Sequence, residues 1–210
     1  MITYYGFELS TNAERVRLAL AHKGLGVKRV DIDPDDRSAV RRVSGQDLVP
    51  VIVDDAGGAP KAVSDSMEIV RYLDERYPDR PLYPKDPARR AEMLIFIDWF
   101  NRVWKRPPNE IEAEMGKPNP DQGRIDRLGR AMIDALGLFE GMLTGREHLM
   151  GEFSAADCCA FPFLKYGLLG TEANDGYLFH RVLVDWQPIK KDHPHLADWI
   201  RRVDKRPRHA

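Results

Sequence analysis

Cysteine is almost absent from this chain of 210 residues. The two cysteines, Cys158 and Cys159, are neighbours, and neighbouring side chains of one helix point about 100° apart, which disfavours a disulfide bond between them. Residues 1–157 contain no cysteine. The sequence therefore excludes a disulfide framework and a cysteine-based metal site, and we interpret the two cysteines as small core residues.

An excess of positive charge is also absent. The chain has 32 Lys and Arg residues against 33 Asp and Glu residues, which gives a formal net charge of -1. Nucleic-acid binding depends on Lys and Arg that neutralise phosphates. We therefore expect no nucleic-acid partner.

Long uncharged apolar runs are missing as well. No stretch is long enough to cross a bilayer, and Met1–Ser10 has no basic segment followed by an apolar one, as a secretory signal has. Hydrophobic residues make up 43% of the chain and charged residues 31%, which is ordinary for a globular protein. We expect a cytoplasmic protein with no membrane partner.

Strand-like and helix-like segments alternate up to about residue 84. Strands are indicated by short runs of β-branched and aromatic residues, and helices by apolar residues at three- and four-residue spacing. The predicted order is β-α-β-α-β-β-α. The strands are expected at Ile2–Tyr5, Val27–Ile32, Leu48–Val53 and Lys61–Val63, and the helices through Val16–Leu20, up to Val43, and from Asp65 to before Pro78.

A proline-rich connection then leads into a helical second part. Pro78, Pro81, Pro84 and Pro87 space out a stiff segment of the kind that joins two packed units. We expect domains at 1–78 and 87–210 with a linker at 79–86. Four helices are predicted from periodicity and start signals: one from Asp86-Pro87 through Trp104, one after Asn119-Pro120 through Leu143, one over Cys158–Leu169, and one over Leu196–Val203.

Five motifs in this order resemble those of the cytosolic glutathione transferases. They are YYGFELSTNAERVRLAL, LVPVIV, VSDSMEIVRYLDERYP, GEFSAAD and HPHLADWIRRVDKRP. The chain is similar to the theta- and zeta-like serine type, as a bacterial-type member. The resemblance spans nearly the whole chain and implies a thioredoxin-like N-terminal domain, which binds glutathione, followed by an all-helical domain.

The loop before the first helix is the candidate catalytic segment. A transferase must ionise its bound thiol, because the thiolate is the nucleophile, and a hydroxyl donor or a helix N-terminus can favour the thiolate. The residues alone leave Ser10 as either an N-cap or a donor; the resemblance implies that it is catalytic. Tyr5 is an alternative donor, although it is better interpreted as a strand residue that packs inward. Thr11 and Asn12 open the same helix and are implied as further glutathione contacts, although Asn12 stands near the place where the theta- and zeta-like loops commonly carry a cysteine.

Two further segments are implied as binding sites for the backbone and the γ-glutamyl end of glutathione. If the Val49–Pro50 bond is cis, as in the family, the backbone of Val49 can pair with the cysteinyl part of glutathione. Pro50 by itself could equally be an edge-strand proline. Asp65 and Ser66 could merely cap a helix, but the resemblance implies that they bind the α-ammonium and the α-carboxylate.

The remaining candidates are weaker. Arg37 and Gln46 are implied at the glycyl end of glutathione, although either could be a solvated surface residue. Phe7, Phe100 and Trp104 are implied as the pocket for an apolar cosubstrate, although core packing is the better interpretation of each residue taken singly. The histidines His180, His193 and His195 lack ligand spacing, so no metal is expected.

The resemblance implies an enzyme that ionises glutathione and adds it to a small hydrophobic electrophile. Two alternatives stay open: a non-catalytic interaction module of the same architecture, and a glutathione-dependent isomerase or dehalogenase. A glutaredoxin-like mechanism is disfavoured, because the catalytic loop has no cysteine. Ser154 and Asp157 are expected to cap a helix and to serve folding, and a homodimer is expected.

Overall fold

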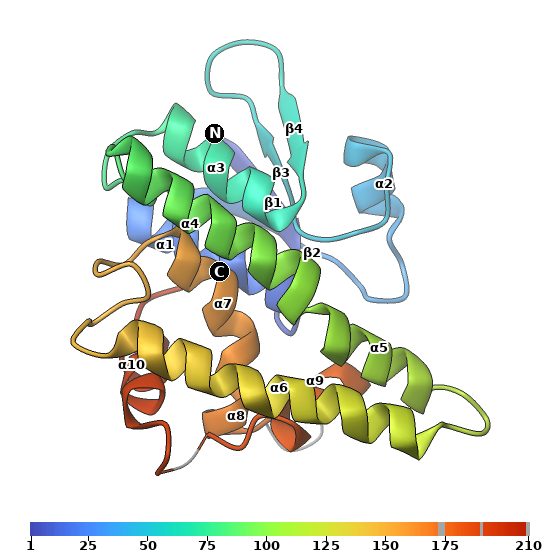
Figure 1. Cartoon of the computed structure of the whole chain (residues 1–210). Helices are drawn as coiled ribbons and strands as arrows, with labels where there is room; N and C mark the ends of the chain where they lie inside the picture. Colours follow the sequence, from blue (N-terminus) through green and yellow to red (C-terminus); the bar gives the residue numbers. More distant parts are fainter. Residues whose placement is uncertain (172–174, 190, 209–210) are drawn as a thin grey trace. The chain divides into compact units, whose positions relative to one another are not determined.

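The computed structural model describes residues 1–171, 175–189 and 191–208. They form two compact units (Figure 1). The first contains Met1–Lys85 together with the residues from Arg206 onward, and the second contains Asp86–Lys205. These limits differ from the predicted ones. Residues 79–85, expected in a linker, belong to the first unit, and Asp86 belongs to the second. Residues 206–208, expected in the second domain, belong to the first unit.

The first unit is a four-stranded sheet in the order β2-β1-β3-β4, with β1 and β2 parallel and the other pairs antiparallel. Helices α1 and α3 pack against each other, while α2 contacts β3 and β4 (Figure 1). This arrangement confirms the predicted element order. The elements are β1 (Ile2–Gly6), α1 (Thr11–Lys23), β2 (Val27–Asp31), α2 (Ser38–Ser44), β3 (Val51–Asp54), β4 (Lys61–Ser64) and α3 (Ser66–Arg76).

Strand β1 is packed on both faces because its side chains alternate. Tyr4 is 1% exposed, and its hydroxyl donates to the Ala13 carbonyl of α1 at 3.4 Å. Tyr5 packs on the other face against a cluster that includes Val40 of α2 and Val51 of β3. The tyrosine pair thus lies between the two layers of helices that cover the sheet.

Lys23, at the end of α1, joins this unit to the segment that follows α3. Its ammonium lies 2.9 Å from Asp74 and donates to the carbonyls of Tyr77, Asp79 and Arg80 at 2.8, 3.0 and 3.3 Å. Because this buried charge is paired and fully hydrogen-bonded, its burial is compensated. The segment from Asp79 to Lys85 is accordingly part of the first unit.

The second unit is helical, as predicted. Its core is an aromatic cluster in which Phe100 and Trp104 stack at 4.5 Å and Phe139 meets both rings edge-on. The helices are α4 (Pro87–Trp99), a π-helical segment η1 (Phe100–Trp104), α5 (Arg106–Met115), α6 (Gln122–Leu143), α7 (Ala155–Leu164), α8 (Tyr166–Leu169), α9 (Leu178–Asp185) and α10 (Pro194–Asp204).

Asp157 anchors the start of α7 and is fully buried. Its carboxylate accepts from the backbone and hydroxyl of Ser154 at 2.9 and 3.0 Å, and from the Trp199 indole at 2.7 Å. The predicted capping role is confirmed. The contact with Trp199 adds a link from α7 to α10.

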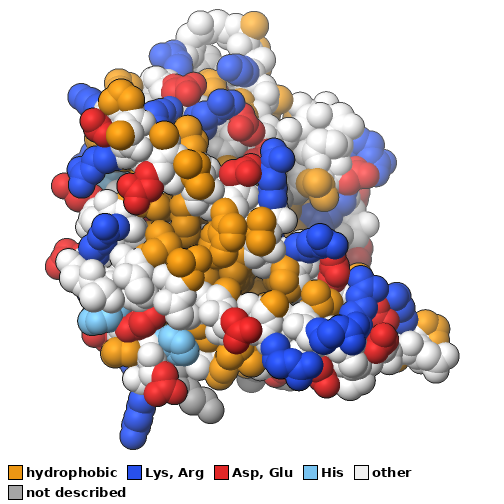
Figure 2. All heavy atoms as spheres, viewed as in Figure 1, with side chains coloured by type: hydrophobic (Ala, Val, Ile, Leu, Met, Phe, Trp, Pro, Cys, Tyr) orange, Lys and Arg blue, Asp and Glu red, His pale blue; other side chains and the backbone are white. Residues whose placement is uncertain are grey.

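Some apolar side chains remain exposed on the second unit. Figure 2 shows hydrophobic side chains gathered over the region between α4 and α6. Leu94 and Ile95 of α4 are 43% and 71% exposed, and Leu138 of α6 is 48% exposed. Within the described ranges, no helix combines the length and the apolar character needed to span a membrane.

Candidate functional site

The register of the sheet brings three connecting segments to one end of the first unit. Tyr5 of β1 is paired with Val51 of β3, and Val51 is paired with Ser64 of β4. The loop after β1, the segment before β3 and the turn after β4 therefore meet at this end. These are the segments that carry Ser10, Val49–Pro50 and Asp65–Ser66.

Ser10 is the N-cap of α1. Its hydroxyl oxygen accepts from the Ala13 N–H at 3.2 Å, and the side chain is partly exposed. A hydroxyl has one donor and two acceptor positions, so Ser10 can cap the helix and still donate its proton. Thr11, which is buried, and Asn12, which is partly buried, begin the helix behind it. Their backbone N–H groups add the partial positive charge of the helix start.

The two tyrosines of β1 pack on opposite faces of the sheet. Tyr5 packs in the hydrophobic cluster beneath α2, in agreement with its interpretation as a strand residue. Burial raises the pKa of Tyr4 well above its usual value, so its hydroxyl stays protonated on the Ala13 carbonyl. A side chain at Gly6 would overlap that hydroxyl. Tyr4 was not among the sequence-predicted site residues.

Glu8 fixes the loop that precedes Ser10. The buried Arg17 binds the Glu8 carboxylate and also donates to the Glu8 carbonyl at 2.9 Å. Arg29 donates to the other carboxylate oxygen at 3.1 Å. Partial burial alone would raise the pKa of Glu8, but the hydrogen bonds and charges of the two arginines outweigh it and lower that pKa. The loop is thereby held to both α1 and β2.

Asp65 and Ser66 form the start of α3. Asp65 has a positive φ of 67° and accepts from the N–H groups of Met67 and Glu68 through one carboxylate oxygen. Ser66 is 4% exposed, and its hydroxyl oxygen accepts from Arg15 of α1 at 3.2 Å. This contact brings the N-terminal turns of α1 and α3 together.

Arg15 is a residue that sequence reasoning missed. It is 2% exposed, and its only visible signal was a cation inside the buried stretch of α1. A charged side chain at such a position needs a polar partner. Its bond to Ser66 could not be predicted, because the two residues are 51 positions apart.

Arg37 lies over the ring of Phe7, in the loop before Ser10. Its guanidinium carbon is 4.9 Å from the centre of the Phe7 ring, and its Nε donates to the Pro34 carbonyl at 3.0 Å. Arg37 Nη1 is buried and has no hydrogen-bond acceptor among the residues that the structure describes. This donor is therefore left unsatisfied among the described residues.

Gln46 braces the segment before β3. Its side-chain amide donates to the Ser44 hydroxyl at 3.0 Å and to the Leu48 carbonyl at 2.9 Å, and it accepts from the Leu48 N–H. The following Val49–Pro50 bond is cis. The expected strand at Leu48–Val53 was too long, because β3 begins only after Pro50, which cannot donate to a strand partner.

The predicted apolar-pocket residues are divided between the two units. Phe7 belongs to the first unit and is partly buried. Phe100 and Trp104 belong to the second, are 0% and 3% exposed, and pack in its aromatic core. Their contacts are those of core residues, and a role in a cosubstrate pocket stays a prediction.

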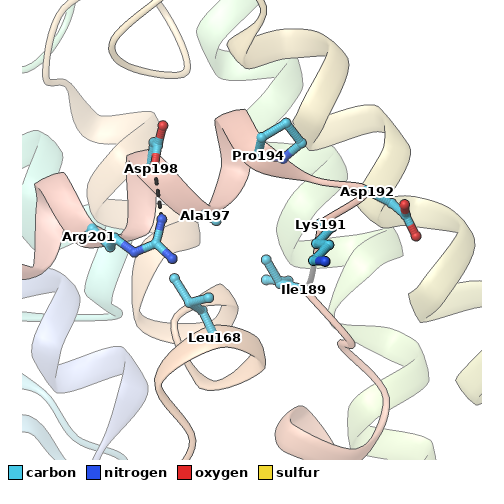
Figure 3. Close-up of a pocket in the computed structure, with 8 residues that line it drawn as sticks. All are labelled: Leu168, Ile189, Lys191, Asp192, Pro194, Ala197, Asp198 and Arg201. Carbon is cyan, nitrogen blue, oxygen red and sulfur yellow. Dashed lines mark hydrogen bonds and ion pairs between the residues drawn. The ribbon is translucent and has the colours of Figure 1, made fainter.

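A separate pocket of about 690 Å³ lies wholly within the second unit, between α8, the start of α10 and the segment before it (Figure 3). Arg201 faces it and is paired with Asp198 at 2.9 Å. None of the sequence-predicted site residues lines this pocket. Its lining comprises Leu168, Ile189, Lys191, Asp192, Pro194, Ala197, Asp198 and Arg201. Over the described part of the chain, no group of three or more His, Cys, Asp or Glu side chains could hold a metal ion.

Comparison with known proteins identifies the class. A thioredoxin-like βαβαββα domain followed by an all-helical domain is the glutathione transferase fold. Residues 5–81 match the family model "Glutathione S-transferase, N-terminal domain". Glutathione S-transferase GstB of Escherichia coli strain K12 is 27% identical over 217 positions, which cover 99% of this chain and 95% of that protein.

Solved structures agree. A crystal structure of a glutathione S-transferase from Rhodospirillum rubrum F11 has a TM-score of 0.75 and 27% identity, over 99% of this chain and 89% of that one. Residues 5–81 thus match the glutathione S-transferase family, and the chain over nearly its whole length is similar to members of that family. A glutathione transferase from Burkholderia graminis shares the fold at a TM-score of 0.77 and 22% identity, over 98% of this chain and 84% of that one, and it binds two glutathione molecules per subunit.

Proposed function

We propose that this protein is a glutathione transferase that uses Ser10 to hold glutathione as a thiolate for attack on a small hydrophobic electrophile. The observation that carries the proposal is the double hydrogen-bonding capacity of Ser10. Its oxygen accepts from Ala13, and its proton can donate to a sulfur anion placed before α1. The thiolate is the nucleophile, so lowering the pKa of the thiol supplies the reactive species.

The neighbouring groups suit the charged ends of glutathione. Ser66 accepts from Arg15, and its own proton and N–H can bind the α-carboxylate at the start of α3. Asp65 uses one carboxylate oxygen for capping, and the other can accept from the α-ammonium. The unpaired Nη1 of Arg37 supports a role at the glycyl carboxylate. Val49, beside the cis bond, is proposed to pair with the cysteinyl backbone.

The conjugation step needs no redox partner. The sulfur of the bound thiolate forms a bond to an electrophilic carbon, and the leaving group departs with its electron pair or, in an addition, the adjacent atom takes a proton from solvent. Because the catalytic loop has no cysteine, a mixed disulfide with the protein is not part of this step.

The proposal is tested by titrating the thiolate absorbance of bound glutathione. Ser10→Ala should raise the thiol pKa toward about 8.5, the ordinary value for a thiol, and should reduce conjugation at neutral pH. Glutathione affinity should change little. Ser10→Thr keeps the hydroxyl and should retain most of the activity. Ser10→Ala also removes the helix cap, and thermal unfolding should show the resulting loss of stability of about 0.5–2 kcal/mol.

Three outcomes would contradict parts of the proposal. If Tyr5→Phe moves the titration and Ser10→Ala does not, Tyr5 is the donor. If glutathione binds but no electrophile in a broad panel reacts, the protein is a binding module. If calorimetry detects no glutathione binding to the parent protein, the assigned cosubstrate is wrong.

A further inference from the structure

The last described residues of the chain lie along helix α1. Arg208 Nε is 2.7 Å from the Glu14 carboxylate in the first turn. Arg206 Nη2 is 3.0 Å from His22 Nδ1 near the other end of the helix. Arg208 also donates to the Arg206 carbonyl at 3.1 Å. Residues 206–208 thus contact α1 at both ends, although 194 positions separate Arg208 from Glu14.

Glu14 connects this segment to the candidate catalytic serine. Its backbone N–H donates to the Ser10 carbonyl at 2.9 Å, one helical turn after the cap. Its side chain is only 3% exposed. A carboxylate in the first turn interacts favourably with the helix N-terminus. The same buried negative charge disfavours an anionic sulfur bound nearby.

Arg208 places a positive charge beside the Glu14 carboxylate. This charge reduces the repulsion between Glu14 and a thiolate bound at Ser10, and the hydrogen bond holds the Glu14 side chain in the first turn of α1. We propose that Arg208 is a positioning residue that acts through Glu14 to favour ionisation of a thiol held at Ser10. This inference rests on the proposed function.

The other charged groups around the start of α1 have contacts of their own. Arg17 binds Glu8, Arg15 binds Ser66, and Asp65 caps α3. None of these contacts involves Arg208. The ion pair of Arg208 with Glu14 is therefore a separate element of the charge balance at this helix start.

His22 provides a second attachment point on α1 for residues 206–208, through its contact with Arg206. Partial burial, followed by the charge of the nearby Arg206, lowers the pKa of His22. A neutral imidazole can accept a hydrogen bond from a guanidinium. The contact between Arg206 and His22 therefore supports the attachment of residues 206–208 to α1 at neutral pH.

The test is a double-mutant cycle read by the thiolate absorbance of bound glutathione. Arg208→Gln should raise the pKa of the bound thiol by about 1, the lower end of the effect of a nearby opposite charge, which leaves about tenfold less thiolate at a pH below both values. Glu14→Gln combined with Arg208→Gln should return the pKa close to that of the parent, because the pair is then neutral. Arg208→Lys should keep most of the effect, and Arg201→Gln, an exposed arginine on α10, is the control that should change nothing.

The outcomes separate this inference from the proposed function. If Ser10→Ala shifts the titration and Arg208→Gln does not, the inference is wrong and the proposed function stands. If Arg208→Gln lowers only the melting temperature, with the thiol pKa unchanged, Arg208 is structural and the inference is overturned. If the double variant stays as impaired as Arg208→Gln, Glu14 does not mediate the effect. Absence of glutathione binding in the parent overturns both proposals.

Discussion

At the scale of single residues, two serine hydroxyls each make a structural contact as acceptor, while no described residue accepts a hydrogen bond from their protons. Ser10 accepts from the backbone of its own helix, and Ser66 accepts from an arginine of another helix. Both stand at helix N-termini, where backbone N–H groups favour anions. Capping and ligand binding are therefore compatible roles, and the choice posed by the sequence between a cap and a donor was not exclusive.

Ser66 provides a prediction at this scale. Ser66→Ala should weaken glutathione binding by about 1.5–3 kcal/mol, the scale of a hydrogen bond to a charged group, which is roughly a 10- to 150-fold increase in Kd. Some affinity should remain, because the backbone N–H persists. Isothermal titration calorimetry measures the change. Ser64→Ala, at an exposed position two residues earlier, is the matched control, and an unchanged Kd for Ser66→Ala would place the γ-glutamyl group elsewhere.

At the scale of elements, the sequence predicted most of the first unit. The strands and helices there are short and alternate, and each is bounded by a local turn or cap signal, such as Gly24 after α1 or Asp65 before α3. Hydrophobic periodicity and turn or cap residues are local features, so one sequence is enough to interpret them. The start of β3 was placed too early, because Pro50 cannot donate to a strand partner.

The second unit was predicted less completely. Helix α5 was not predicted, and Pro107 and Pro108 occupy its first turn, where the missing N–H groups cost nothing. The expected single helix through Trp104 instead changes to π-helical geometry at Phe100. Helix α6 begins after Asp121, which caps it, and not at Asn119-Pro120. The expected helix over Cys158–Leu169 divides near Lys165 into α7 and α8.

Long-range partners of the site were not predictable from sequence. Arg15 and Arg208 form hydrogen bonds with residues 51 and 194 positions away, and no local spacing indicates such pairs. The helical segment α9 was also missed, because it has only eight residues and no strong start signal. The motifs that resemble the family indicated the segments of Ser10, Val49–Pro50 and Asp65–Ser66. The side chains that contact these segments became visible only in the tertiary structure.

Helix α6 gives a prediction at this scale. Gly129 faces the Trp186 ring so closely that a Cβ would overlap it, whereas Gly137 has open space around its position. Alanine favours helix by about 1 kcal/mol over glycine. Gly129→Ala should nevertheless lower the free energy of unfolding by about 1–3 kcal/mol, since overpacking displaces the tryptophan.

Gly137→Ala is the control in the same helix and should raise the free energy of unfolding by up to about 1 kcal/mol. Urea denaturation followed by circular dichroism measures both variants. Equal stabilisation by the two substitutions would show that Trp186 moves aside without cost. The opposite signs expected here separate helix propensity from packing.

At the scale of the whole molecule, the similarity to GstB extends over both units, since it covers 99% of the chain. The family model, in contrast, matches only residues 5–81. The groups that we assign to glutathione all lie in the first unit. The second unit carries instead the exposed apolar side chains of α4 and α6, which a chain in isolation leaves in contact with water.

These exposed side chains support the prediction of a homodimer. Contiguous apolar surface on a water-exposed protein marks contact sites, and closed two-fold dimers are the commonest assembly. Ile95 of the second unit is 71% exposed, and Leu48 of the first unit, beside the proposed glutathione segment, is 77% exposed. We expect both side chains to be covered in the dimer.

Multi-angle light scattering should therefore give a mass of twice 24.0 kDa for the parent protein. Ile95→Glu and Leu48→Glu should each shift the mass toward 24.0 kDa, because a carboxylate buried without a partner is strongly unfavourable. Leu169→Glu, at a position 46% exposed on α8, is the control and should leave the dimer intact. A parent mass of one chain at all concentrations would refute the dimer, and dissociation by Leu169→Glu alone would move the interface to α8.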